Sequence, residues 1–193
     1  MQIVYGNSTN LHPQLMNSAA RYRHKVFIEK LGWQLNCHDL LENDQFDRPD
    51  TVYVIAKNES GDIAGIARLL PTTRPYLLGD VFPQLLNGSK PPVSEDVWEL
   101  SRFAAVDFDA QHTTAMGQFS SSQAIELLNA AIECACRHGA KRLITVSPIG
   151  VERLMRKLGL QARRAGPPMV TNNQSVCAYW IELTPEEGVA HEH

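Results

Sequence analysis

The sequence has no run of about 18 apolar residues, the length that a helix needs to cross a membrane, so it predicts no membrane span. Residues 1–10 have neither the basic start nor the apolar stretch of a secretion signal, so we expect a cytoplasmic protein. With 18 basic and 21 acidic residues the net charge is −3, which offers no general excess of positive charge. We therefore expect no binding to nucleic acid.

Cysteine is scarce, and its spacing suits neither a zinc ribbon nor a disulfide framework. The four residues are Cys37, Cys134, Cys136 and Cys177. We expect reduced thiols and no metal site. The glycine-rich dinucleotide and phosphate-binding loops, the His-Glu-x-x-His zinc motif and the Gly-x-Ser-x-Gly nucleophile motif are also missing. These absences remove the usual anchors for dinucleotide enzymes, P-loop enzymes, zinc proteases and serine hydrolases.

What remains is the composition of one soluble domain, with 193 residues, 44% of them apolar and 20% charged. We expect strands over 2–5, 51–57, 63–70, 97–105, 142–147 and 176–183, and helices over 11–31, 120–138 and 151–158. Residues 34–50 are predicted to form a polar, acidic loop, and the proline-rich stretch 71–92 a connection with one short helical turn. This order predicts an α/β fold, a single mixed-sheet domain over 1–184 with helices on both faces, and a loose tail over 185–193.

An unusual set of charged and aromatic residues occupies the first half of the chain. Arg23 and Phe27 lie four apart and share one face of the first expected helix, and Trp33 follows its end. Glu99 and Arg102 lie three apart in an expected strand, so they point to opposite faces unless a bulge or a strand end lies between them. The other members of the set are Asp44 and Asp47 in the acidic loop and Arg68 in a strand.

These residues carry a resemblance to the N-acyl-homoserine lactone synthases, the bacterial autoinducer synthases. It rests on Arg-His-Lys-Val-Phe at 23–27 with Gly-Trp at 32–33, Asn-Asp-Gln-Phe-Asp at 43–47, Ala-Arg-Leu-Leu-Pro-Thr-Thr at 67–73 and Trp-Glu-Leu-Ser-Arg-Phe at 98–103. The match spans residues 1 to about 183 in order. It implies a fold similar to the GCN5-related N-acetyltransferases, in which two central strands splay to form a V-shaped cleft.

The resemblance also implies a reaction. An enzyme of this family makes an N-acyl-L-homoserine lactone, a quorum-sensing signal, from S-adenosylmethionine and an acylated acyl carrier protein, and releases methylthioadenosine and the holo-carrier protein. S-adenosylmethionine is then a substrate, and no cofactor is expected. Its binding site is expected to include Arg23, Phe27, Trp33, Asp44, Asp47 and Arg102, and the catalytic set Glu99, Arg102, Arg68 and Asp47.

Several of these assignments have a simpler alternative. Glu99 is our choice of general base, since the α-amino group must lose a proton before it attacks. The alternative is that Glu99 only orients Arg102. Asp44 and Asp47 suit the cationic end of the substrate, or else belong to a solvated acidic loop. Arg68 suits a substrate carboxylate or a structural ion pair, and the sequence does not distinguish which arginine holds the carboxylate.

The acyl chain is expected between two strands, in a pocket formed by Ser101, Phe103, Ala104, Val146 and Ser147. Ser147 either meets a substituent at the third acyl carbon or bonds to the backbone. Residues 137–164 hold eight basic residues and one acidic residue, which leaves the rest of the chain near −10. This asymmetry predicts either a solvated face or a docking site for the acidic carrier protein, with Arg142, Arg153, Arg156 and Lys157 as contacts.

Two other functions compete with a synthase. An acyl-CoA-dependent N-acetyltransferase of the same fold normally has a glycine-rich, basic turn for pyrophosphate, whereas residues 108–122 contain a single glycine, Gly117, and no Lys or Arg. A non-catalytic module that binds an acidic protein has no need of buried ionisable groups, which are costly to desolvate. Acyl-chain length, substitution at the third carbon and oligomeric state are left open by the sequence.

Overall fold

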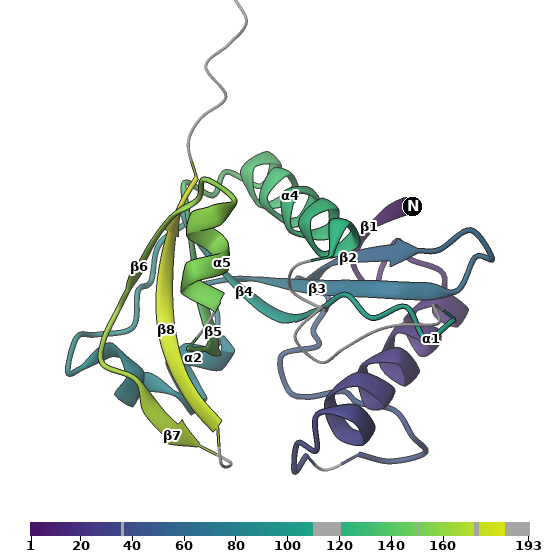
Figure 1. Cartoon of the computed structure of the whole chain (residues 1–193), viewed down its shortest axis with the longest axis horizontal. Helices are drawn as coiled ribbons and strands as arrows, with labels where there is room; N and C mark the ends of the chain where they lie inside the picture. Colours follow the sequence, from purple (N-terminus) through teal and green to yellow (C-terminus); the bar gives the residue numbers. More distant parts are fainter. Residues whose placement is uncertain (36, 110–120, 150, 172–173, 184–193) are drawn as a thin grey trace, which may run out of the picture.

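One eight-stranded mixed sheet organises the chain, in the order β1-β2-β3-β4-β5-β8-β6 with β7 paired to β8 (Figure 1). The computed structural model describes residues 1–35, 37–109, 121–149, 151–171 and 174–183. The strands are β1 Gln2–Gly6, β2 Val52–Lys57, β3 Ile63–Pro71, β4 Val97–Ala104, β5 Arg142–Pro148, β6 Gln161–Arg164, β7 Met169–Thr171 and β8 Gln174–Glu182. The helices are α1 Pro13–Arg23, α2 Leu77–Val81, α4 Ser122–Arg137 and α5 Val151–Lys157, with a π-helix η1 at His24–Lys30 and a 3₁₀ turn η2 at Pro83–Leu86. The predicted tail and Ser120 lie outside the described residues.

Helices cover both faces of the sheet, as the sequence predicts. In β2, Val52 and Val54 belong to the apolar cluster under α4 and α5, whereas Tyr53 and Ile55 belong to the cluster under α1. Alternate residues of a strand point to opposite faces, so a strand buried on both sides needs a continuous apolar run, and β2 has one. A third cluster lies between β4, β5, β8 and the α2–η2 segment.

The first expected helix, over 11–31, is two helices of different type. The α-helix α1 ends at Arg23, and a π-helix continues to Lys30, with Leu31 N–H donating to the Val26 carbonyl at 3.0 Å. The single added residue of a π-turn rotates the following side chains and is common near functional sites. Gly32 then turns the chain with a φ of 70°, the left-handed conformation that favours glycine.

Three elements were not expected from the sequence. Strands β6 and β7 are short, exposed on most positions and lie at the outer edge of the sheet. Edge strands tolerate charged side chains, so the Gln-Ala-Arg-Arg sequence of β6 gives no apolar alternation to detect. The proline-rich connection holds two turns, α2 and η2, instead of one.

The two central strands, β4 and β5, diverge as the expected cleft requires. They pair in parallel only from Val97 with Arg142 to Leu100 with Thr145, although β4 continues to Ala104 and β5 to Pro148. At the same point the β3–β4 ladder shifts register, because Arg68 pairs with Ser101 but Ile66 pairs with Ala104. Two residues of β4 therefore face one residue of β3, which is a β-bulge.

The bulge changes which residues share a face. Arg102 sits in it with a φ of 49°, a strained conformation for a residue with a side chain. Without the bulge Arg102 would point away from Glu99. With it, both side chains lie on the side of the sheet covered by α1 and α2. Of the two arrangements expected to bring them together, a bulge or a strand end, the structure has the bulge.

Candidate active site

Three arginines and three carboxylates form a buried ion cluster beside the bulge of β4. They come from the end of α1, the acidic loop, β3 and β4, and their formal charges balance. The members are Arg23, Arg68, Arg102, Glu42, Asp44 and Asp47. Taking six charges out of water is costly even when they are paired, so a cluster of this kind inside a domain points to function.

Each guanidinium nitrogen of Arg23 has a partner within this ion cluster. Its Nη1 and Nη2 each donate to one carboxylate oxygen of Asp47, at 2.7 and 3.1 Å, and its Nε donates to Glu42. Asp47 also accepts the hydroxyl of Tyr53 at 2.6 Å. Although burial alone would raise the pKa of Asp47, the charges of Arg23 and Arg68 hold it well below its usual range. Asp47 is therefore a permanent carboxylate at neutral pH.

Arg68 is held on two sides and has one guanidinium nitrogen without a partner. Its Nε donates to Ser101 at 3.1 Å, and its Nη1 donates to Asp44 at 2.6 Å and to Asp47 at 3.2 Å. Its Nη2 is buried and has no hydrogen-bond partner among the described residues. An unpaired guanidinium nitrogen inside a protein is costly, so this position suits an anionic group of a ligand.

Arg102 joins the ion cluster to the two predicted aromatic residues. Its Nη2 donates to Glu42 and to Asp44, each at 2.9 Å. The rings of Phe27 and Trp33 stack with centroids 4.8 Å apart, and the Arg102 guanidinium carbon lies 5.6 Å from each centroid. The aromatic pair that we expected in the substrate-binding site therefore faces this guanidinium.

The acidic loop holds its carboxylates by local hydrogen bonds. Asp44 N–H donates to Asp47 at 2.7 Å, and Phe46 N–H donates to Asp44 at 2.9 Å. Phe46 is 1% exposed and anchors the loop in the cluster under α2. The loop is thus folded into the core, and the solvated alternative for Asp44 and Asp47 does not hold.

Glu42 is a site residue that was not predicted individually and belongs to the expected acidic loop over 34–50. It is 1% exposed and bridges Arg23 and Arg102, and its main-chain N–H donates to Ala20 of α1 at 3.1 Å. The signal in the sequence was Phe46, because an aromatic side chain in an acidic segment predicts an inward turn that carries its neighbours with it.

Glu99 lies next to the cluster but does not bond to Arg102 among the described residues. It is fully buried, and its two oxygens accept the main-chain N–H groups of Leu77 and Leu78, at 2.9 and 2.6 Å, where α2 begins. Burial raises its pKa to about 7, against the lowering effect of these two hydrogen bonds and of Arg68 and Arg102. The alternative in which Glu99 orients Arg102 is thus not what the structure shows.

The expected acyl-pocket residues do not line one wall. Phe103 and Ala104 belong to clusters on opposite faces. Val146 packs against the third cluster, and its neighbour Ser147 lies on the opposite face of β5, the face of Thr145. Ser101 is engaged by Arg68. Because successive strand residues alternate, a chain lying on one face meets only part of this set.

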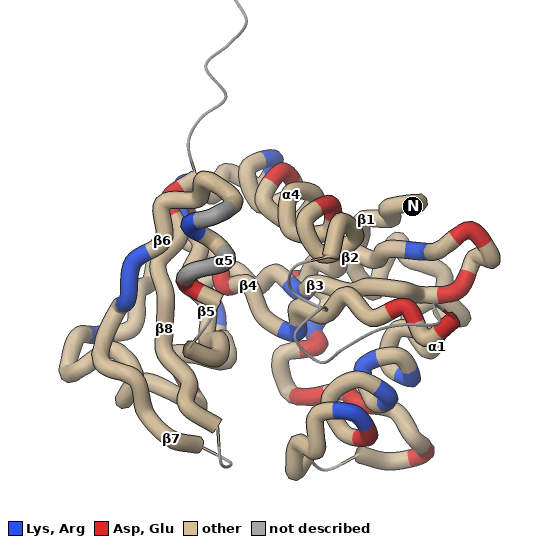
Figure 2. The backbone as a smooth tube through the Cα atoms, in the orientation of Figure 1, with Lys and Arg blue, Asp and Glu red and all other residues tan. Residues whose placement is uncertain are grey.

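The basic residues are spread over two faces of the β5–β8–β6 sheet edge. Arg156 and Arg164 both pair with Glu152 of α5, at 2.6 and 2.8 Å, while Arg142 and Arg163 flank the ring of Trp180 on the other face. Figure 2 shows the basic band on β6 at the outer edge. The side chains of Arg153 and Lys157 lie outside the described part of the structure.

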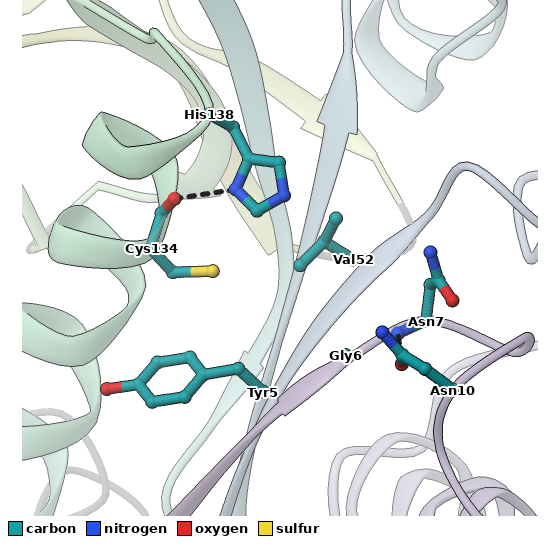
Figure 3. A pocket seen from close by; sticks show the side chains of 7 residues that line it. All are labelled: Tyr5, Gly6, Asn7, Asn10, Val52, Cys134 and His138. Carbon is teal, nitrogen blue, oxygen red and sulfur yellow. Dashed lines mark hydrogen bonds between the residues drawn. The ribbon is translucent and has the colours of Figure 1, made fainter.

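A separate small pocket lies between the start of the chain and the end of α4 (Figure 3). Its lining includes Tyr5, Asn7, Asn10, Cys134 and His138. The Nδ1 of His138 is hydrogen-bonded to the Cys134 carbonyl oxygen at 2.8 Å. None of the eight predicted site residues lines it. The described residues contain no group of three or more side chains suited to a metal and no helix that could span a membrane.

Residues 8–189 match the model of the family described as Autoinducer synthase. The acyl-homoserine-lactone synthase of Acinetobacter nosocomialis is 52% identical over 183 residues, which cover 95% of this chain and all of that protein. The chain belongs to the autoinducer synthase family. It is an acyl-homoserine-lactone synthase.

Several solved structures have the same fold as this synthase. TofI, in a ternary complex with an inhibitor and MTA, superposes with a TM-score of 0.82 at 43% identity, over 95% of this synthase and 92% of that chain. LasI gives 0.83 at 30% identity over 95% and 90%. BjaI, described as CoA-dependent and solved with SAM and isopentyl-CoA, gives 0.81 at 25% identity over 94% and 83%. A putative N-acetyltransferase from Lactobacillus plantarum, at 18% identity over 95% and 98%, gives 0.61 and confirms the acetyltransferase-like fold.

Proposed function

We propose that this synthase joins an acyl thioester to S-adenosylmethionine and closes the homoserine lactone. The α-amino nitrogen attacks the thioester carbonyl carbon, the carbon–sulfur bond breaks, and the thiol leaves with the proton that the amine has lost. The methionyl carboxylate then attacks its own γ-carbon, and the bond to the sulfonium breaks to release neutral methylthioadenosine. The observation that carries the proposal is the convergence of all eight predicted residues on the bulge of β4.

The ion cluster suits the charged end of S-adenosylmethionine. Asp47 stays ionised. The carboxyl groups of Asp44 and Asp47 can attract the ammonium and sulfonium groups, and Phe27 and Trp33 supply an apolar wall. The unpaired Nη2 of Arg68 is our choice of donor to the methionyl carboxylate, because each guanidinium nitrogen of Arg23 already has a partner. The substrate would then complete the cluster rather than displace it.

Glu99 is our choice of general base. A carboxyl with a pKa of about 7 is roughly half ionised at neutral pH, which is near the optimum for taking a proton from an amine directly or through one water. A main-chain N–H near Arg102 is our choice of donor to the thioester oxygen as it becomes an oxyanion, since the bulge turns this stretch toward the point where β4 and β5 part.

We further propose that the acyl donor is an acylated acyl carrier protein. Its support is the basic surface of α5 and β6, where Arg156 and Arg164 are exposed on 65% and 43% of their side chains. An acidic carrier protein fits such a surface, whereas binding of free CoA needs phosphate ligands at a defined point. BjaI shows that the fold also serves CoA-dependent synthases, so acyl-CoA is the alternative donor.

One experiment separates the candidate functions. The protein is incubated with S-adenosylmethionine and either an acylated carrier protein or the matching acyl-CoA, and methylthioadenosine is measured by mass spectrometry. We expect release with the carrier protein. Release with acyl-CoA alone would support the CoA-dependent branch, release of an acylated acceptor without methylthioadenosine would support an N-acetyltransferase, and no turnover would support a binding module.

Reversal of two exposed charges should weaken carrier binding selectively. In a variant with Arg156→Glu and Arg164→Glu, we expect the KM for the acylated carrier protein to rise about tenfold, since several close charge pairs are lost, while the KM for S-adenosylmethionine stays within twofold. Steady-state kinetics at low and high salt measures both values, and the difference should shrink at high salt.

The matched control places the same charge change on the other half of the molecule. Arg21 and Lys25 are exposed on the α1–η1 segment, and changing both to Glu alters the net charge by the same amount. We expect little change in either KM. Equal effects of the two double variants would show that only net charge matters and would remove the assigned docking surface.

A further inference from the structure

The phenol of Tyr179 is a buried polar group without a hydrogen-bond partner among the described residues, although Cys177, Arg164 and Glu152 are close enough to interact with it electrostatically. Tyr179 is fully buried in β8, within the cluster that β4, β5, α4 and α5 share. Its hydroxyl has no hydrogen-bond partner among the described residues. The nearby Cys177 thiol donates instead to the Gly166 carbonyl oxygen at 3.2 Å and makes no hydrogen bond of normal geometry with the phenol.

Strand pairing places Tyr179 in the row of residues next to the point where β4 and β5 part. Tyr179 pairs with Thr145 across β5 and β8, and Thr145 pairs with Leu100, the last residue of β4 that β5 holds. The three side chains therefore stand in one row on the face covered by α5, which contributes Met155 to the same cluster. Beyond this row β4 and β5 part, and Ser147 continues the same face of β5.

A buried hydroxyl without a hydrogen-bond partner is unusual and needs a physical explanation. A buried donor that makes no hydrogen bond costs free energy compared with Phe, which would fill the same space. Such a cost is recovered when a ligand brings the missing partner, and the same site then discriminates strongly against ligands that lack it. Tyr22, in contrast, has both partners: its hydroxyl donates to the Val106 carbonyl oxygen at 3.0 Å and accepts the Val106 N–H at 2.8 Å.

We propose that the Tyr179 hydroxyl is a specificity-determining group that hydrogen-bonds an oxygen substituent on the acyl chain. The inference rests on the proposed function, because it places the chain of an acyl thioester on the α5-covered face where β4 and β5 part. A phenol both donates and accepts, so it fits either a hydroxyl or a keto oxygen. The preferred substrate class is then an acyl thioester with an oxygen near the thioester, rather than a plain saturated chain. The half-buried Ser147 lies on the same face as a second polar contact.

The test removes only the hydroxyl, with Tyr179→Phe. The kcat/KM is measured for two acylated carrier proteins of equal chain length, one with a hydroxyl on the third acyl carbon and one unsubstituted. We expect the wild-type protein to prefer the oxygenated chain. In the variant we expect kcat/KM for that chain to fall about 10- to 100-fold, while the value for the unsubstituted chain stays the same or rises.

A second measurement separates specificity from structure. The melting temperature of ligand-free Tyr179→Phe should equal or exceed that of the wild type, because no bond is lost. The matched control, Tyr22→Phe, removes a hydroxyl with two partners and should lower the melting temperature by several degrees without changing the ratio of the two substrates.

The outcomes are distinguishable from those of the proposed function. A wild-type protein that releases no methylthioadenosine with either substrate contradicts the proposed function itself. If the wild type is active but Tyr179→Phe leaves the substrate ratio unchanged, or lowers both rates equally, the hydroxyl serves a bound water or the fold and the inference about Tyr179 is overturned.

Discussion

Replacing Asp47 by Asn should destabilise the protein by about 3–5 kcal/mol, the usual cost of leaving a buried charge without its partner. Asp47 is the carboxylate that both Arg23 and Arg68 share, and it also binds the Tyr53 hydroxyl. The variant keeps the shape of the side chain but leaves three positive and two negative charges in the cluster. Urea denaturation of the wild type and the variant at pH 7 measures the difference in the free energy of unfolding.

An exposed ion pair supplies the control. Glu133 pairs with Arg137 on α4, where both side chains are more than half exposed, and Glu133→Gln should cost at most about 1 kcal/mol. A loss for Asp47→Asn no larger than for Glu133→Gln would mean that water or a rearranged side chain compensates Arg23 and Arg68. The cluster would then have to be regarded as solvated.

The same variant has a distinct dependence on pH. Because the folded protein holds the pKa of Asp47 below its usual value of 3.8, the ionised carboxylate contributes stability that is fully present above that value and is lost as the pH falls toward the lowered pKa. The gap between wild type and Asp47→Asn should therefore narrow as the pH is lowered below about 4. Chemical denaturation at a series of pH values measures it.

Much of the central fold follows from the sequence because the elements there have strong local signals. The continuous apolar run of β2 and the turn at 58–61 define a buried hairpin, and α4 has an apolar stripe that ends at Gly139. The outer strands β6 and β7 have no such signal, since edge positions are half solvated and accept almost any side chain. The hydrophobic periodicity of the sequence does not reveal the π-helix either, because a π-helix adds one residue within a single helical segment.

The sequence predicts which residues form the site, but not which hydrogen bonds and ion pairs they make. The spacing of Glu99 and Arg102 shows that a bulge or a strand end is needed for them to share one face, but the bulge itself depends on how β3 and β4 pair, which is a long-range property. The partner of Glu99 proved to be the start of α2 rather than Arg102. Main-chain N–H groups exist in every segment, so no residue type marks the one that a buried carboxylate will bind.

This last contact decides how the general-base proposal can be tested. Glu99→Gln keeps the size of the side chain but cannot take a proton, so kcat should fall by about 10²–10⁴-fold, the range typical of general-base catalysis. Binding of S-adenosylmethionine, measured by calorimetry, should stay within a few fold. Equal losses in turnover and binding would instead indicate that Glu99 only holds α2 in place.

The pH profile gives a sharper test. With a pKa of about 7, wild-type kcat/KM should rise through pH 7 as Glu99 ionises, and this step should be missing in Glu99→Gln. The effect on stability has the opposite sign. Since the pKa is raised above its usual value of 4.5, the contribution of Glu99 to stability is full below pH 4.5 and declines as the pH rises toward 7. Activity and stability should therefore change in opposite directions over this interval.

Leu77→Pro separates the two roles without removing the carboxylate. Leu77 is the first residue of α2, a position that accepts proline, and the change deletes one of the two N–H donors to Glu99. A hydrogen bond to the ionised form lowers a pKa, so its loss should move the midpoint of the activity profile above pH 7 while activity at higher pH is retained. A midpoint that stays in place would mean that the titrating group is not Glu99, because no other group in the site loses a hydrogen bond in this variant.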